Sequence, residues 1–102
     1  MYDKRRAKTP AGKWKEYRSN AKVRSLSFEL TFDQFMLFWQ KPCHYCGDPI
    51  ETIGLDRIDN ALGYVIANVQ PCCTTCNMAK KKRDAAAYIA HCVKVAKHLG
   101  VV

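Results

Sequence analysis

Two Cys-x-x-Cys pairs constrain the fold of this chain more than any other feature. Cys43 and Cys46 form the first knuckle, residues 43–46, and Cys73 and Cys76 form the second knuckle, residues 73–76. Each knuckle presents two sulfur atoms from one tight turn, which is the spacing of a four-thiolate zinc site. A chain of 102 residues has room for one modest hydrophobic core, so a metal ion that joins two distant turns would stabilise it. We expect a single domain, residues 1–102, with one structural Zn²⁺.

The six cysteines could instead form three disulfides. However, no apolar secretion segment follows the charged start, and no run of about 20 apolar residues could span a membrane, so we expect a cytoplasmic protein. A reducing compartment disfavours disulfides. Cys72 competes with Cys73 for the second knuckle, but its spacing to Cys76 is longer, and we predict that it is a small buried residue. We interpret Cys92, on the apolar stripe of a later helix, in the same way.

The formal net charge of +8 is concentrated at the N-terminal end. Residues 1–42 carry ten Lys or Arg against four acidic residues, and the remainder carries seven against five. Trp14 and Tyr17 lie among the basic residues, so one element could contact both phosphates and bases; the alternative is a solvated basic face. The candidate nucleic-acid-binding residues are Lys13, Lys15, Arg18, Lys22, Arg24, Lys80 and Lys81.

Helices are expected before and after the knuckles. Thr9-Pro10 opens a helix that runs toward Arg24, because Pro is favoured at the first helical position. Thr31 and Gln34 form a capping box for a second helix, which ends at Lys41-Pro42. A short helix over residues 77–82 and a last helix capped by Asp84 are expected after the second knuckle. The aromatic and sulfur-containing residues at helical spacing in the second helix should be core: Phe32, Phe35, Met36 and Trp39.

Between the knuckles the pattern predicts a β-hairpin. Residues 53–58 and 64–69 are expected as two short strands around the turn of residues 59–63. The predicted fold is α+β, with a basic helical part (1–42), a zinc-knuckle hairpin-and-helix core (43–82) and a C-terminal helix (83–102).

The run Gly54-Leu55-Asp56-Arg57-Ile58-Asp59-Asn60, followed by Gly63-Tyr64, Asn68-Val69 and Cys72-Cys73-Thr74-Thr75-Cys76-Asn77-Met78-Ala79-Lys80, resembles the zinc-knuckle HNH endonucleases. These belong to the ββα-metal superfamily, and the likeness is to small phage-type and restriction-type members. The resemblance covers residues 43–80. It implies a hairpin and a helix that grip one divalent cation, with hydrolysis of DNA phosphodiester bonds as the activity.

The resemblance also implies roles for single residues. Asp56 would be the cation ligand on the first strand and Asn77 the ligand on the helix, with Mg²⁺, Mn²⁺ or another divalent cation bound between them. Asn68 would fasten the hairpin loop by side-chain hydrogen bonds. A carboxylate and an amide are suitable oxygen donors for such a cation.

One position departs from the family pattern. The family has His after the first Asp, where it takes a proton from the attacking water, and this sequence has Arg57. Arginine stays protonated near neutral pH, so it cannot act as that base, but it can clamp a phosphate. Some restriction-type members that are similar here also have Asp-Arg. The first candidate base is Tyr45, whose phenol a nearby Arg57 would make more acidic, and the second is His44. Tyr64 is expected to be a packing residue of the hairpin loop, and Asp59 could hold a water or cap the loop.

Two functions from different classes follow. The first is a metal-dependent HNH-type DNA endonuclease, and the second is a zinc-stabilised DNA-binding module that has lost cleavage; a protein-interaction zinc module is a weaker third. One site per chain is compatible with a nicking monomer or a homodimer with twofold symmetry. A phage-encoded protein in the host cytoplasm would fit the resemblance.

Overall fold

The computed structural model describes residues 8–102, so the first basic residues of the N-terminal part, within 1–7, lie outside the described residues. The elements are α2 (Pro10–Val23), α3 (Phe32–Met36), β1 (Leu55–Arg57), the 3₁₀ helix η1 (Ile66–Asn68), β2 (Val69–Pro71), α4 (Thr74–Lys80) and α5 (Ala85–His98). The expected α+β fold is present, with a two-stranded hairpin between helices.

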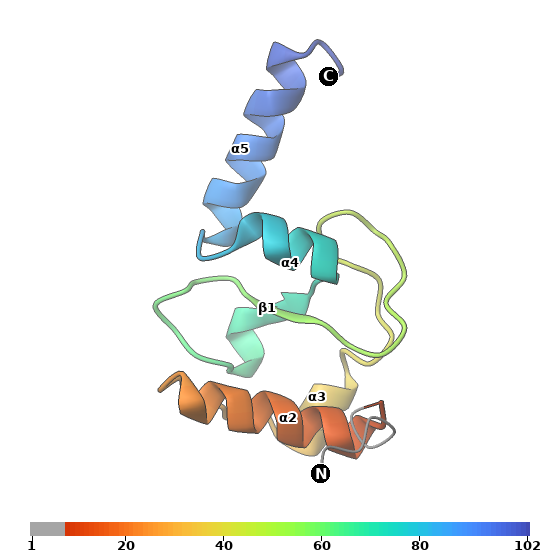
Figure 1. Cartoon of the computed structure of the whole chain (residues 1–102), viewed down its shortest axis with the longest axis vertical. Helices are drawn as coiled ribbons and strands as arrows, with labels where there is room; N and C mark the ends of the chain where they lie inside the picture. Colours follow the sequence, from red (N-terminus) through yellow and green to blue (C-terminus); the bar gives the residue numbers. More distant parts are fainter. Residues whose placement is uncertain (1–7) are drawn as a thin grey trace.

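The hairpin separates two sets of helices (Figure 1). Helices α2 and α3 lie on one side of it, and α4 lies on the other. Helix α5 projects away from α4 along the long axis, which gives the molecule extents of 48 × 27 × 26 Å. The functional residues predicted between the knuckles therefore lie in the middle of the molecule.

The caps of the first two helices are those that the sequence predicts. The Thr9 hydroxyl accepts from the Gly12 N–H at 3.0 Å, with Pro10 in the first turn. Thr31 and Gln34 form both hydrogen bonds of the capping box. Helix α3 ends at Met36, earlier than expected, because bonds between residues three apart replace the α-helical pattern after it.

The hairpin differs from the prediction in its second strand. Strand β1 lies inside the expected range, but β2 is Val69–Pro71 and not residues 64–69. Tyr64 makes a parallel bridge with Phe28, and the helix η1 follows Tyr64 in the chain. The residues just before β2 therefore belong to a long loop and not to the strand. The antiparallel register pairs Leu55 with Pro71, Asp56 with Gln70 and Arg57 with Val69.

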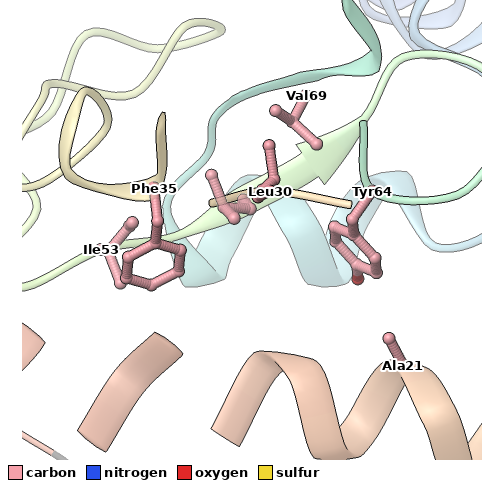
Figure 2. Close-up of a cluster of buried hydrophobic side chains, with 7 residues drawn as sticks. Ala21, Leu30, Phe35, Ile53, Tyr64 and Val69 are labelled. Carbon is pink, nitrogen blue, oxygen red and sulfur yellow. The ribbon is translucent and has the colours of Figure 1, made fainter. Parts of the chain in front are cut away.

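A hydrophobic core fills the space between α2, α3 and the hairpin (Figure 2). Phe35 is fully buried in it, as expected, whereas Phe32 is 37% exposed. Trp14 and Tyr17 pack against this core, and each makes a hydrogen bond there: the indole N–H donates to the Leu30 carbonyl at 3.1 Å, and the Tyr17 hydroxyl accepts from a β1 N–H at 3.1 Å. The expectation that these two rings face nucleic acid is therefore wrong. The buried core residues are Ala21, Leu30, Phe35, Ile53, Leu55, Tyr64 and Val69.

The last two helices also correct the prediction. Helix α4 begins at Thr74, so it contains part of the second knuckle instead of following it. Only the first turn of α5 is packed: Ala85 and Tyr88 are buried, and the rest of its apolar stripe faces outward. Cys92 lies in that outer part and is exposed, so its predicted burial is wrong; Cys72 is buried, as predicted.

Candidate functional site

The four knuckle cysteines lie together between the hairpin and α4. Their Sγ atoms are all within 4.8 Å of one another. Gly47, with φ +79°, closes the first knuckle, and its N–H donates to the Cys43 carbonyl at 2.9 Å. Cys73 is the N-cap of α4, and its sulfur accepts from the Cys76 N–H at 3.4 Å. Together with Cys46, these cysteines provide four thiols that can coordinate one metal ion tetrahedrally.

The thiols differ in how readily they ionise. Burial opposes ionisation of Cys43, but backbone hydrogen bonds, the largest from Cys46 and Cys73, outweigh it and lower its pKa to about 6. Burial raises the pKa of Cys76 to about 12, and hydrogen bonds with the neighbouring thiols add to this increase. Several thiolates in one cluster repel one another unless a cation compensates their charge. The cluster therefore suits a divalent metal ion.

Asp56 is the centre of a hydrogen-bond network beside the cysteines. Its side chain is 4% exposed. The Tyr45 hydroxyl donates to Oδ2 of Asp56 at 2.5 Å, and Nε2 of Gln70 donates to the Tyr45 hydroxyl at 2.7 Å. The same Nε2 lies 3.3 Å from Oδ2, since Gln70 pairs with Asp56 across the hairpin. The network joins the first knuckle to both strands.

Tyr45 is not in the environment that the sequence suggested. Burial is the largest cause that raises the pKa of its phenol, and the hydrogen bond to Asp56 is the second. The described hydrogen bonds of the Arg57 guanidinium are to the hairpin loop and not to Tyr45. The expected decrease in the pKa of Tyr45 is therefore wrong, because its nearest charge is a carboxylate.

Lys80 reaches the same carboxylate from α4. Its Nζ lies 2.9 Å from Oδ1 of Asp56 and donates to the Arg57 carbonyl at 3.2 Å. Lys80 is 1% exposed, so its ammonium has no surface for a phosphate in this structure, in contrast to the expected DNA contact. Removing either partner of a buried ion pair leaves a charge without compensation, which is strongly unfavourable.

Arg57 faces the other side of the hairpin, because neighbouring residues on a strand point in opposite directions. Its Nη1 donates to the carbonyls of Asn60 and Leu62 at 2.8 and 2.9 Å. The guanidinium also lies over the Tyr64 ring, with Cζ 5.8 Å from the centroid. These contacts hold the side chain of Arg57 at the hairpin loop.

Asn68 fastens that loop from inside. Its Oδ1 accepts from the Asp59 N–H at 2.9 Å, and its Nδ2 donates to the carbonyls of Asp59 and Gly63, both at 3.0 Å. Asn68 is 4% exposed, so these hydrogen bonds to the loop are buried. Asp59 accepts from the Ala61 N–H through its own carboxylate at 2.8 Å.

Asn77 lies in the middle of α4, and its side chain is exposed. It follows Cys76 directly and precedes Lys80 by three residues, and residues at this spacing are neighbours on a helix surface. Asn77 is thus one turn from the ion pair with Asp56. The second base candidate, His44, is exposed and contacts Tyr45 edge-on at 5.5 Å between ring centroids. Tyr64 is a core residue, in agreement with its expected packing role.

The basic residues of α2 do not share one face. The helical repeat places Lys15, Arg18 and Lys22 along one stripe, and all three are exposed. Lys13 lies on another side and forms an ion pair with Glu16 at 3.9 Å. Two further residues complete the predicted set: Arg24 donates to the Tyr64 hydroxyl at 3.5 Å, and Lys81 is exposed just after α4.

No family model matches the chain. The uncharacterized protein R423 of Acanthamoeba polyphaga mimivirus is 37% identical over 71 residues, which are 67% of this chain but 13% of that protein. The solved structure of PacI, a rare-cutting HNH restriction endonuclease described for its mechanism of DNA perturbation, superimposes with a TM-score of 0.69. The match covers 88% of this chain and 78% of PacI at 22% identity. The chain has the HNH endonuclease fold.

Within this HNH fold, sequence reasoning missed two partners of Asp56. Gln70 could not be found, because the predicted second strand ended before it; with β2 at Val69–Pro71 it lies opposite Asp56. Lys80 was seen only as a basic residue, although its position one turn after Cys76 and Asn77 places it on the same helix. Among residues 8–102, no helix has the length and apolar content needed to cross a membrane.

Proposed function

We propose that the chain is a divalent-cation-dependent DNA endonuclease of the HNH type. The observation that carries this proposal is a buried carboxylate, Asp56, on the first hairpin strand and beside the helix that holds Asn77, in a chain with the HNH fold. Burying a carboxylate costs free energy unless another group compensates its charge, so a buried acid is rarely present for packing alone. A buried acid on this hairpin is better explained by chemistry.

The two predicted ligands suit the cation that the fold family uses. The Asp56 carboxylate and the Asn77 amide offer oxygen atoms, which Mg²⁺ and Mn²⁺ prefer, and the thiol cluster is a separate donor set that suits Zn²⁺. When bound, the divalent cation would stabilise negative charge on the scissile phosphate. Asp56 and Asn77 would hold it, and the cysteines would hold the structural zinc.

Arg57 would contact the scissile phosphate in this proposal. Its described hydrogen bonds use Nη1, and a guanidinium has five N–H donors in all, so further donors remain for a phosphate. The exposed stripe of Lys15, Arg18 and Lys22, with Lys81, would supply contacts to the DNA backbone.

Tyr45 and Gln70 would position Asp56. We assign Tyr45 this role rather than that of the base, because its hydroxyl donates to Asp56 and its pKa is raised. Tyr45→Phe removes the donor but keeps the ring, so it should reduce cleavage by about ten- to a hundredfold if Asp56 must be held in place.

The test is conversion of supercoiled plasmid by zinc-loaded protein, with and without added Mg²⁺ or Mn²⁺. Asp56→Ala and Asn77→Ala should abolish cleavage, and Asn77→Ala should do so with zinc content and fold unchanged. Zinc content and circular dichroism are measured for both variants, because Asp56→Ala also leaves the buried Lys80 ammonium without its partner. Asp33→Ala and Asn20→Ala are matched controls on exposed positions, and both should cleave like the wild type. Equal cleavage by Asp56→Ala and the wild type would overturn the proposal.

Substitutions of Arg57 distinguish two mechanisms, one in which the guanidinium stabilises the phosphate and one in which an imidazole activates water. Arg57→Ala should also disable cleavage, because it removes the phosphate contact. Arg57→His restores the usual family base but removes the clamp. Full activity of Arg57→His would mean that the guanidinium is dispensable and that water activation by an imidazole is sufficient.

A DNA-binding module without cleavage is the second candidate. The observation that favours it is the ion pair of Asp56 with Lys80, which compensates the carboxylate without any metal. Salt-dependent DNA binding without cleavage in Mg²⁺, Mn²⁺ or Ni²⁺ would select this function.

A further inference from the structure

Both oxygen atoms of Asp56 are already in contact with donors. Oδ2 accepts from Tyr45 and lies near Nε2 of Gln70, while Oδ1 lies 2.9 Å from the Lys80 ammonium. Tyr45 and Gln70 are neutral donors, so only Lys80 brings a positive charge. A divalent cation that binds Asp56 must share the carboxylate with that charge or displace it.

Neither course is free of cost. If the ammonium stays, two like charges lie close together where little water can screen them. If it leaves, Lys80 gives up its contacts with Asp56 and the Arg57 carbonyl at a site where it is 1% exposed. Either way, part of the free energy of cation binding is lost to Lys80.

We propose that Lys80 is an internal counter-ion that sets the cation affinity of the Asp56 site. It holds the carboxylate in place in the free protein and competes with the divalent cation for it. This inference rests on the proposed function, since it takes Asp56 to be the cation ligand. A neutral side chain at position 80 should therefore bind the cation more tightly than lysine does.

The test measures Mn²⁺ binding to zinc-loaded protein, from the electron paramagnetic resonance signal of free Mn²⁺, with no DNA present. Lys80→Met removes the charge and keeps an unbranched side chain that is one atom shorter. Lys80→Gln removes the charge and keeps a hydrogen-bond donor, so it remains informative if Lys80→Met does not fold. Lys82→Met removes the same charge from an exposed position two residues away and is the matched control. Asp56→Asn identifies binding that depends on Asp56.

We expect Lys80→Met and Lys80→Gln to bind Mn²⁺ at least about tenfold more tightly than the wild type, and Lys82→Met to be unchanged. Wild-type or weaker affinity in both Lys80 variants, with binding lost in Asp56→Asn, would overturn this inference and leave the proposed function in place. An equal gain in Lys82→Met would also overturn it, because the effect would then be general electrostatics. Wild-type affinity in Asp56→Asn would remove both the inference and the proposed cation site.

Discussion

The two sides of the hairpin are packed by different means. Toward α2 and α3 the hairpin buries an apolar core, in which Phe35 is fully enclosed and aromatic rings meet edge to face. Toward α4 it meets a cluster of thiols and a buried ion pair, Asp56 with Lys80. One side contains the residues that a hydrophobic core prefers, and the other contains a pair of charges, which such a core excludes unless they compensate each other.

This difference separates stability from chemistry. The α2 side gains free energy by removing apolar surface from water and needs no ligand for it. The α4 side has few apolar side chains, and a metal ion bound by the four thiols would supply stability there. A metal ion held by the four thiols would fix the surrounding turns, so that polar and ionisable groups could be kept there. The proposed cation ligands, Asp56 and Asn77, are therefore expected on the metal side, whereas Arg57 and the basic stripe of α2 lie elsewhere.

Loss of one knuckle cysteine should have the largest effect. We expect Cys43→Ser or Cys73→Ser to reduce zinc from one ion per chain to none and to unfold the protein, because a structural zinc contributes about 10–16 kcal/mol, as much as the roughly 5–15 kcal/mol by which domains are stable. Elemental analysis and circular dichroism measure both changes. Cys92→Ser and Cys72→Ser are the controls and should retain zinc. Loss of zinc in Cys72→Ser but not in Cys73→Ser would show that Cys72, and not Cys73, is the zinc ligand.

Truncation in the apolar core should have the next largest effect. Phe35→Ala should lower the free energy of unfolding by about 3–5 kcal/mol, through lost burial and a new cavity, while the folded protein keeps its zinc. Chemical denaturation gives the stability, and a zinc-sensitive dye reports release. Phe32→Ala, at a partly exposed ring, should cost less. Zinc release from Phe35→Ala before the core unfolds would show that the two sides do not unfold together.

The outer face of α2 should affect DNA binding and not stability. We expect Lys15→Gln with Lys22→Gln to reduce the slope of log affinity against log salt by about 2, because two phosphate contacts are removed. Duplex binding by fluorescence anisotropy at several salt concentrations measures the slope. Lys94→Gln with Lys97→Gln removes the same charge from α5 and should leave the slope unchanged. Equal slopes for the α2 variant and the wild type would make this stripe a solvated face.

Removal of one core hydrogen bond should have the smallest effect. Trp14→Phe loses the donor to the Leu30 carbonyl, and we expect a cost of about 1 kcal/mol in unfolding free energy. DNA affinity should not change, because the ring packs in the core. A fall in DNA affinity without a change in stability would show that Trp14 contacts DNA.

Local sequence patterns predicted much of this molecule. The helix start at Pro10, the capping box at Thr31 and the α+β order all depend on residues within a few positions of one another, so they can be read along the chain. The sequence also predicted that the four knuckle cysteines lie together, because two Cys-x-x-Cys turns restrict which residues can share a metal ion. Asp56 and Asn77 became candidate ligands through the resemblance of residues 43–80 to the HNH endonucleases.

What surrounds Asp56 was decided by tertiary structure. Gln70 contacts it only because β2 starts at Val69 and pairs with β1 in a register that places Gln70 opposite Asp56. Tyr64, expected in that strand, instead bridges to Phe28, which is distant in sequence. Lys80 contacts it only because α4 packs over the hairpin. The sequence by itself determined which chemical groups are present and how the local turns and helices begin. Tertiary packing determined their partners, since burial, strand register and the direction of a side chain depend on parts of the chain that no local pattern links.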